Sequence, residues 1–232
     1  MSVPSQGISM PTHFRHLSDT EWAIVDPVFG ATLPMRVRVF LGDGLGAEGR
    51  PFTVPTSVIS SSLIALGIAN PFASLAGPAG WVTAPLRTAK AIAVGRLASV
   101  VNAGFVINVG RDYYFRGLTV DDYGKALLVH EMTHVWQGKN DTLALNATLG
   151  SLAAQCKGVA TTRSMAGSGL AYDYTMTPTP VWGNLNPEQQ AQIVEHWYTG
   201  FDPATRTWGA ATDTGNPRFS YIRDYVRAGK VK

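Results

Sequence analysis

The stretch Leu128–Trp136, "LVHEMTHVW", decides how the chain is interpreted. It places two histidines, His130 and His134, four residues apart in an apolar run, with Glu131 directly after the first. On an α-helix, positions i and i+4 lie on one face, so both imidazoles point the same way. Glu131 lies about 100° around the axis, within reach of anything bound between the two rings. This His-Glu-x-x-His pattern predicts a zinc site with its own general base.

The chemistry of such a site explains why these residue types are needed. Neutral imidazole binds Zn²⁺ at ~2.0–2.1 Å, and a catalytic site uses three protein ligands and a water. The metal lowers the pKa of that water to about 7, and Glu131 can accept its proton and deliver it to the leaving amine. If His130 and His134 were instead ordinary helix residues, two of the chain's five histidines would share this register by coincidence. Leu127 and Trp136 are expected to pack the helix onto the core.

The overall composition is that of a folded globular protein. The chain has 232 residues, of which 45% are hydrophobic and 15% charged, so it can bury a sizeable core and is expected to form one domain. Within it, residues 1–110 are expected to hold strands and an apolar segment, and residues 111–232 the metal site. A net charge of +3 without a block of like charges predicts no nucleic-acid partner.

The sequence also bears on compartment and membrane. A single cysteine, Cys156, excludes an intramolecular disulfide and fits synthesis in a reducing compartment. Residues 1–16 lack the cationic segment and apolar run of a secretory signal, so the expected location is cytoplasmic. The longest apolar stretch, 57–109, leaves no uninterrupted span of ~20 residues, and no stable membrane span is expected. Its interruptions are Pro71, Pro78, Pro85, Lys90 and Arg96.

Capping signals predict where the helices begin. A capping box at Ser18–Glu21 opens one helix, and residues 119–122 open the helix that carries the two histidines. That helix is expected to run to about Gln137, with Gly138 as its stop. The dipeptides Asn186-Pro187 and Asn216-Pro217 open two more. Weaker patterns predict helices at 85–103 and 141–155 and strands at 36–41, 105–109, 113–115 and 171–175. The fold class is therefore α+β, with a mostly helical second half.

The run Gly44–Gly49 matches a dinucleotide-binding pattern, GxGxxG, after the expected strand. That function requires a helix directly afterwards. Pro51 and Pro55 follow instead, and two prolines four residues apart forbid it. The glycines are therefore expected to form a loop.

The third zinc ligand has several candidates. The metzincin pattern requires a glycine at position 137 and a histidine at position 140, which are Gln137 and Asn140 here, so that class is excluded. The downstream segment "EQQAQIVEHWY" begins with Glu188, and its first five residues resemble the ligand helix of glutamate zincins. Ala191 would let that helix approach the histidine helix closely. Gln192 stands where an acid normally orients a ligand histidine, which implies lower metal affinity or activity.

Glu195, Asp173 and His196 are alternative ligands. Glu188 and Glu195 are seven residues apart, so both could face the metal from one helix. Glu188 is favoured because the small Ala191 and the amide of Gln192 follow at the spacing of a ligand helix. Glu195 is flanked by bulkier groups that suit a cleft rim or a position next to the ligands. The candidates for stabilising the oxyanion of the transition state are His196, Tyr198, Tyr172 and Tyr174.

Together, "HEMTHVWQ" (130–137) and "EQQAQIVEHWY" (188–198) resemble bacterial Vgr-related zincin-like proteins, which are associated with type VI secretion and related contractile injection systems. The upstream "GLGAEGRPFTVPTS" (44–57) and "AYDY" (171–174) share the likeness, which covers about 36 to 200. It implies a gluzincin-type fold, with a small sheet beside the HExxH helix and a downstream ligand helix. His130, His134 and Glu188 would be the zinc ligands and Glu131 the catalytic glutamate. It also implies export by a contractile secretion system.

Three hypotheses follow. The first is a zinc metallopeptidase effector that cleaves a protein in a target cell, a wall peptide or a component of the secretion machine. The second is an adaptor or cargo of that machine which keeps the fold, with or without a structural zinc, and has no turnover. Gln192 favours this second hypothesis and Glu131 opposes it. The third is a membrane-active toxin built on residues 57–109, which predicts liposome leakage that survives loss of the zinc ligands.

Overall fold

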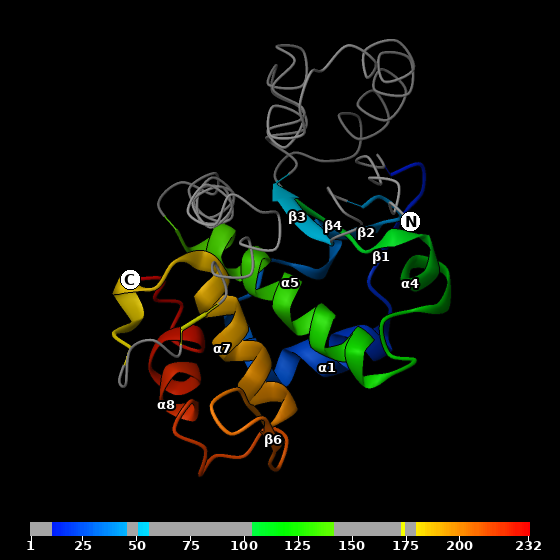
Figure 1. Ribbon diagram of the computed structural model, residues 1–232. Coiled ribbons are helices and arrows are strands. Elements are labelled where there is room, and N and C mark those ends of the chain that lie inside the picture. Colours follow the sequence, from blue (N-terminus) through cyan, green and yellow to red (C-terminus); the bar gives the residue numbers. More distant parts are fainter. Residues whose placement is uncertain (1–10, 46–50, 56–103, 142–172, 175–179) are drawn as a thin grey trace, which may run out of the picture. The chain divides into compact units, whose positions relative to one another are not determined.

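The computed structural model describes residues 11–45, 51–55, 104–141, 173–174 and 180–232 (Figure 1). Several predictions fall wholly or mostly outside these ranges: the helices at 85–103 and 141–155, the environment of Cys156, the oxyanion candidate Tyr172 and the apolar stretch 57–109. The chain divides into two compact units. One comprises Met1–Leu17 and Met35–Arg116, and the other comprises Ser18–Pro34 and Gly117–Lys232.

The first unit contains a four-stranded sheet. Its strands are β1 (Phe14–His16), β2 (Val39–Gly42), β3 (Phe52–Pro55) and β4 (Phe105–Asn108), in the order β1-β2-β4-β3. The central pair β2 and β4 is parallel, and the two outer strands are antiparallel to their neighbours. Both central strands are buried along their whole length, as expected for apolar strands in the middle of a sheet.

Two strand predictions near this sheet are confirmed with shifted boundaries, and one is wrong. The strand expected at 36–41 starts late, because Arg36–Arg38 forms a 3₁₀ turn before β2. The strand expected at 105–109 is β4. The strand expected at 113–115 is instead part of helix α4 (Gly110–Arg116). Gly110, with a φ of +80°, turns the chain after β4, and Arg116 pairs with Asp112 at the i,i+4 spacing that supports a helix.

The segment after the glycine run is extended. Residues 52–55 form β3, which pairs with β4, so the helix that a dinucleotide site requires is not there. As predicted from the sequence, the segment that contains Pro51 and Pro55 is not helical. Residues 46–50 of the run lie outside the described residues.

Asp43, directly after β2, ties the residues before β1 to this sheet. Its carboxylate is buried and accepts hydrogen bonds from the backbone N–H groups of Thr12 (2.6 Å) and His13 (3.0 Å). The Thr12 hydroxyl and the His13 ring Nδ1 also contact it, each at 2.9 Å. Burial opposes the negative charge, but these hydrogen bonds outweigh it and lower the pKa of Asp43 from 3.8 to about 2.

Asp43→Asn is expected to destabilise this unit by about 2 kcal/mol near neutral pH, since each unit of pKa shift corresponds to about 1.4 kcal/mol. The pKa of Asp43 is lower in the folded than in the unfolded state, so its contribution is complete above the unfolded value. It is lost as the pH falls from about 4 towards about 2. Urea unfolding of wild type and variant between pH 7 and pH 2 measures this. Asp112→Asn, which removes an exposed pair with Arg116, is the control and should have a small effect. A difference for Asp43→Asn that is constant over the whole pH range would contradict the prediction.

The second unit is built around three helices. Helix α1 (Asp19–Phe29) begins with the predicted capping box, in which Ser18 accepts from the backbone of Glu21 and Glu21 accepts from the backbone of Ser18. Glu21 is buried and also accepts from the backbone N–H of Leu118 at 3.2 Å. Helix α1 packs against helix α5, so the capping glutamate also fixes the chain that leads into α5.

Helix α5 (Asp122–Asn140) carries the His-Glu-x-x-His pattern. Asp121 caps it by accepting from the backbone N–H of Gly124 at 2.7 Å. The predicted stop at Gly138 is wrong, because the helix continues to Asn140. The Asn140 amide donates to the carbonyls of Thr32 and Trp136, which holds the last turn against another segment.

The packing predicted for α5 is confirmed at Trp136. Its side chain is fully buried, and its indole N–H donates to the carbonyl of Val226 at 3.0 Å. Leu127 is half-buried.

Helix α7 (Pro187–Thr199) begins at the predicted Asn186-Pro187 signal, with a capping box between Asn186 and Gln189. It lies beside α5 (Figure 1). The two helices are antiparallel: Gln137, near the end of α5, donates to the carbonyl of Pro187 at the start of α7. Ala191 is fully buried, as a small residue between closely packed helices should be.

The remaining described elements complete this unit. They are two 3₁₀ turns (Gly30–Thr32 and Trp182–Asn184), a hairpin of β5 (Phe201–Asp202) and β6 (Thr207–Trp208), helix α8 (Phe219–Tyr221) and a π-helical turn (Ile222–Val226). The last two confirm a helix near the predicted Asn216-Pro217 start, but it begins at Phe219, with Arg218 rather than Asn216 at the N-cap position. Of the strand predicted at 171–175, residues 173–174 are described and have no regular structure. The small sheet and the helices together make the chain α+β, as predicted. No helix in the described ranges is long and apolar enough to cross a membrane.

Candidate metal centre

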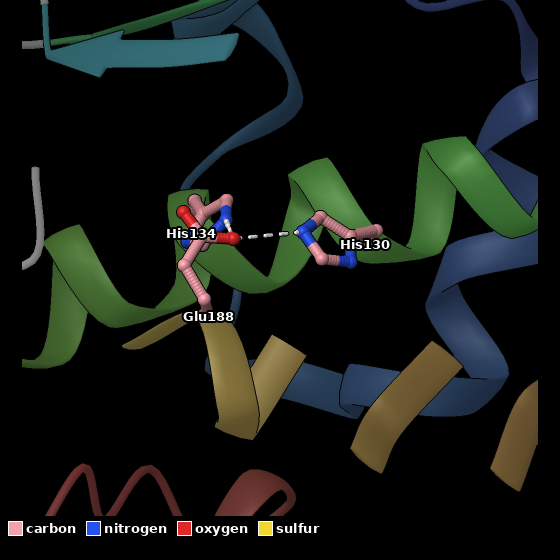
Figure 2. Close-up of side chains that lie close together, drawn as sticks. All are labelled: His130, His134 and Glu188. Atoms are coloured by element: carbon pink, nitrogen blue, oxygen red, sulfur yellow. Dashed lines mark hydrogen bonds and ion pairs between the residues drawn. The ribbon is translucent and has the colours of Figure 1, made fainter. Parts of the chain in front are cut away.

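The centre forms where the histidine face of α5 meets the first turn of α7. Figure 2 shows His130 and His134 on consecutive turns of α5, with Glu188 reaching towards both rings from α7. His130 and Glu188 are buried, at 8% and 2% exposure. Sequence periodicity on one helix and a cap on the other therefore bring the three predicted ligands together.

The distances from Glu188 to the two histidines fit a zinc ion. The Oε2 atom of Glu188 lies 3.3 Å from Nε2 of His130 and 3.5 Å from Nε2 of His134, and one ligand atom from each residue lies within 4.8 Å of the others. Four ligands held tetrahedrally at ~2.0–2.1 Å from zinc are about 3.3 Å apart. The Oε2 atom of Glu188 therefore already lies at nearly the distance from both Nε2 atoms that a shared zinc ion would require.

The other nitrogen of each ring is held by an acceptor. His130 Nδ1 lies 2.9 Å from Oε2 of Glu195, and a carboxylate can only accept, so Nδ1 is the donor. His134 Nδ1 lies 2.9 Å from the amide oxygen of Gln137. With Nδ1 protonated in both rings, Nε2 is the atom that both histidines direct at Glu188. Hydrogen bonds of this kind fix the tautomer and orientation of metal-binding histidines.

The Glu188 carboxylate and the two imidazoles stabilise each other's charged forms. Burial disfavours a charged imidazole, but hydrogen bonds and charge from Glu188 and Glu195 raise the pKa of His130 well above 6.5. The pKa of His134 is also raised, because the negative charge of Glu188 outweighs burial. Burial opposes ionisation of Glu188 too, but the two histidines hold its pKa well below 4.5. The buried carboxylate is therefore ionised and paired, and it is ready to act as a ligand.

Glu131 does not belong to this triad. It is buried, at 4% exposure, directly after His130 on α5, and its charge contributes to the raised pKa of His134. It therefore lies near His134, and its role as general base stays a prediction.

The predicted role of Gln192 requires a correction. Its amide lies 2.8 Å from Nε2 of His196 rather than next to a ligand histidine, and Glu195 takes the expected place beside His130. Helix geometry explains this. Around the axis of α7, Glu195 lies within about 20° of Glu188, because it follows seven residues later, whereas Gln192, four residues later, lies about 40° away. Because the helices are antiparallel, moving along α7 from Glu188 leads from His134 towards His130. The acid that orients a ligand histidine is therefore present, one turn later than expected.

His196 and Tyr174, two of the oxyanion candidates, belong to a network on the Glu195 side of the centre. His196 Nδ1 lies 2.7 Å from the Tyr174 hydroxyl, which accepts from Nε of Arg218 at 2.9 Å. Arg218 also pairs with Asp202 at 3.1 Å. Burial lowers the pKa of His196 to about 4 and raises that of Tyr174 to about 12. Both side chains are therefore neutral near pH 7 and can act only through hydrogen bonds.

Two further candidates do not join the triad. Tyr198 lies in the last turn of α7, where burial raises its pKa and its charged neighbours are Lys125 and Asp122 at the start of α5. Asp173 is half-buried, and its backbone carbonyl accepts from Gln189. Within the ranges that the structure describes, only His130, His134 and Glu188 group as possible metal ligands.

The residue that the sequence analysis missed as part of the centre is Gln137, considered there only as the end of a helix and as a departure from the metzincin pattern. Its position three residues after His134 puts its side chain within reach of that ring on one helix face. That spacing was available in the sequence, but the orientation of the amide was not.

No family model, curated protein or solved structure matches the chain.

Proposed function

We propose that the protein is a zinc-dependent metallopeptidase of the gluzincin type, with His130, His134 and Glu188 as ligands and Glu131 as general base. One observation carries this proposal. The Glu188 oxygen lies 3.3 and 3.5 Å from the Nε2 atoms of His130 and His134, close to the ligand separations of a zinc site, and the outward nitrogen of each histidine is held by an acceptor. The zincin-like fold is proposed on the same ground.

Each residue has a defined task. A bound Zn²⁺ would polarise the scissile carbonyl and lower the pKa of a water molecule to about 7. Glu131 takes the proton from the attacking water and passes it to the amine that leaves as the peptide bond breaks. Glu195 holds His130 in the ligating tautomer. Tyr174 or His196 supplies a neutral hydrogen bond to the developing oxyanion.

The main alternative is an adaptor or cargo that binds zinc without turnover. In the sequence, this alternative is favoured by Gln192, which stands where an acid normally orients a ligand histidine. Glu195, at 2.9 Å from His130 Nδ1, supplies a carboxylate for the same task, so the lowered basicity expected from an amide no longer favours that alternative. The buried Glu131 favours catalysis, because a structural zinc site has no use for a general base.

The resemblance to Vgr-related zincin-like proteins supports a place in a bacterial contractile secretion system. On that basis the substrate is a protein or peptide in a target cell, a wall peptide, or another component of the machine, and the route of export is the contractile apparatus. The proposed peptidase chemistry does not depend on this assignment, since its support is the centre alone.

Purified wild-type protein is expected to contain about one zinc per chain, and His130→Ala and His134→Ala are expected to lose it, because two remaining protein ligands hold zinc poorly. Elemental analysis of protein produced with added zinc measures this, with circular dichroism to verify the fold. A peptide-library cleavage assay, with and without a chelator, tests turnover. Zinc-free wild-type protein would refute the metal centre. Stoichiometric zinc without cleavage of any peptide would support the adaptor.

A further inference from the structure

Two buried glutamines connect His134 to segments far from it in the sequence. Gln137 on α5 is fully buried and Gln190 on α7 is 3% exposed. The Gln137 oxygen faces His134 Nδ1 at 2.9 Å, and its nitrogen contacts the Gln190 oxygen at 2.9 Å. The Gln190 nitrogen in turn lies 3.1 Å from the carbonyl oxygens of both Trp182 and Val231. A continuous line of hydrogen bonds thus runs from the centre to two backbone carbonyls.

The carbonyls at the far end determine how each amide is oriented. A backbone carbonyl can only accept, so the Gln190 side chain must turn its NH₂ towards Trp182 and Val231 and its oxygen towards Gln137. Gln137 must then turn its NH₂ towards Gln190 and towards the carbonyl of Pro187, at 3.0 Å. Its oxygen is left facing His134, where only a donor fits. Neither amide can rotate by 180° without placing oxygen against oxygen.

We propose that Gln137 and Gln190 form an amide relay that fixes His134 as an Nε2 ligand, which makes both glutamines positioning residues of the metal centre. The inference rests on the zinc site of the proposed function. Without an acceptor at Nδ1, the His134 ring can rotate or change tautomer and present an N–H to the ion. With the acceptor, Nε2 carries the lone pair and the ring is more basic. Loss of such a partner typically weakens metal binding by about 10–100-fold.

Two substitutions at position 137 separate positioning from packing. Gln137→Met keeps the volume but removes the acceptor, and the dissociation constant for Zn²⁺ is expected to rise by about 10–100-fold. Gln137→Glu keeps an acceptor for His134 while losing both donated hydrogen bonds, so its zinc affinity should exceed that of Gln137→Met. Competition titration with a chromophoric chelator measures both constants. Equal weakening in the two variants would show that only the donated contacts matter, and it would overturn the proposal.

A matched control lies one turn further along α5. Asn140 also donates to two backbone carbonyls, of Thr32 and Trp136, but it has no hydrogen bond to a ligand. Asn140→Leu should therefore lower the unfolding temperature to an extent comparable with Gln137→Met and leave zinc affinity within about twofold of wild type. Weakening of zinc binding by Asn140→Leu to the level of Gln137→Met would assign the effect to helix stability and overturn the proposal.

The role of Gln190 is tested by a double-mutant cycle. Gln190 reaches His134 only through Gln137, so Gln190→Met should weaken zinc binding several-fold in wild type and have no further effect in Gln137→Met. In zinc-loaded protein labelled with ¹⁵N-histidine, the Nδ1–H signal of His134 should be slow to exchange in wild type and fast in both single variants. Additive effects on affinity would contradict a relay. Wild-type protein that binds no zinc would refute the proposed function itself, whereas a zinc-binding wild type with unaffected Gln137→Met refutes only the relay.

Discussion

Glu188→Ala protein is expected to purify with far less than one zinc per chain. The substitution leaves two protein ligands, and it also removes the negative charge that both imidazoles face at 3.3 and 3.5 Å. Structural and catalytic zinc sites in proteins need at least three protein ligands, so zinc should be lost during dialysis. Glu188→Gln keeps the size of the side chain and its helical position, and it is expected to show the same loss.

Glu195 provides the matched comparison, since it lies on the same helix and contacts the same histidine through the opposite nitrogen. Glu195→Gln should retain about one zinc per chain and bind it about 10–100-fold more weakly. Elemental analysis and chelator competition distinguish the two outcomes. Full zinc content in Glu188→Ala, together with loss in Glu195→Gln, would exchange the roles assigned to the two glutamates.

Glu131→Gln is expected to keep its zinc and lose peptide cleavage by a factor of at least ~10², because general-base catalysis contributes about that much. Glutamine has nearly the same shape as glutamate but cannot accept a proton at neutral pH, so the change isolates the proton transfer. Zinc content and circular dichroism should match those of wild type. The rate is measured on the best peptide from the library.

Two results would argue against this role for Glu131. Cleavage that is retained in Glu131→Gln, but lost in His134→Ala, would place the base on another residue. Zinc that is lost from Glu131→Gln would mean that the glutamate supports the metal rather than the proton transfer. Either result leaves the triad of ligands unaffected, since none of its distances involves Glu131.

Local signals account for the part of the fold that was predicted correctly. Ser18, Asp121 and Asn186 cap their helices with side-chain hydrogen bonds to residues three positions away, and such short-range contacts can be inferred from sequence. The aromatic residues at 113–115 favour a strand, but the turn at Gly110 and the following i,i+4 pair make that segment helical.

The centre was predictable to the extent that it depends on helix periodicity. The face shared by His130 and His134 follows from their spacing alone, and Glu188 followed from the helix that it opens. The partners of the outward nitrogens did not follow, because they depend on how α7 is rotated against α5. A rotation of about 60° separates the place of Gln192 from that of Glu195, and no sequence pattern specifies it. The orientation of the Gln137 amide likewise depends on groups far along the chain, the carbonyl of Pro187 50 residues later and the side chain of Gln190 53 residues later.

The proposed ligands come from two different helices, which has a consequence for the resistance of the protein to heat. His130 and Glu188 are 58 residues apart in the chain, so an ion held by both acts as a removable crosslink that closes a long loop. A covalent link across a loop of that length would lower the conformational entropy of the unfolded chain and so stabilise the folded state by about 4 kcal/mol at 25 °C. Metal clips act in the same direction. The melting temperature should therefore follow the free zinc concentration, and a chelator should act on the folded protein as a mild denaturant.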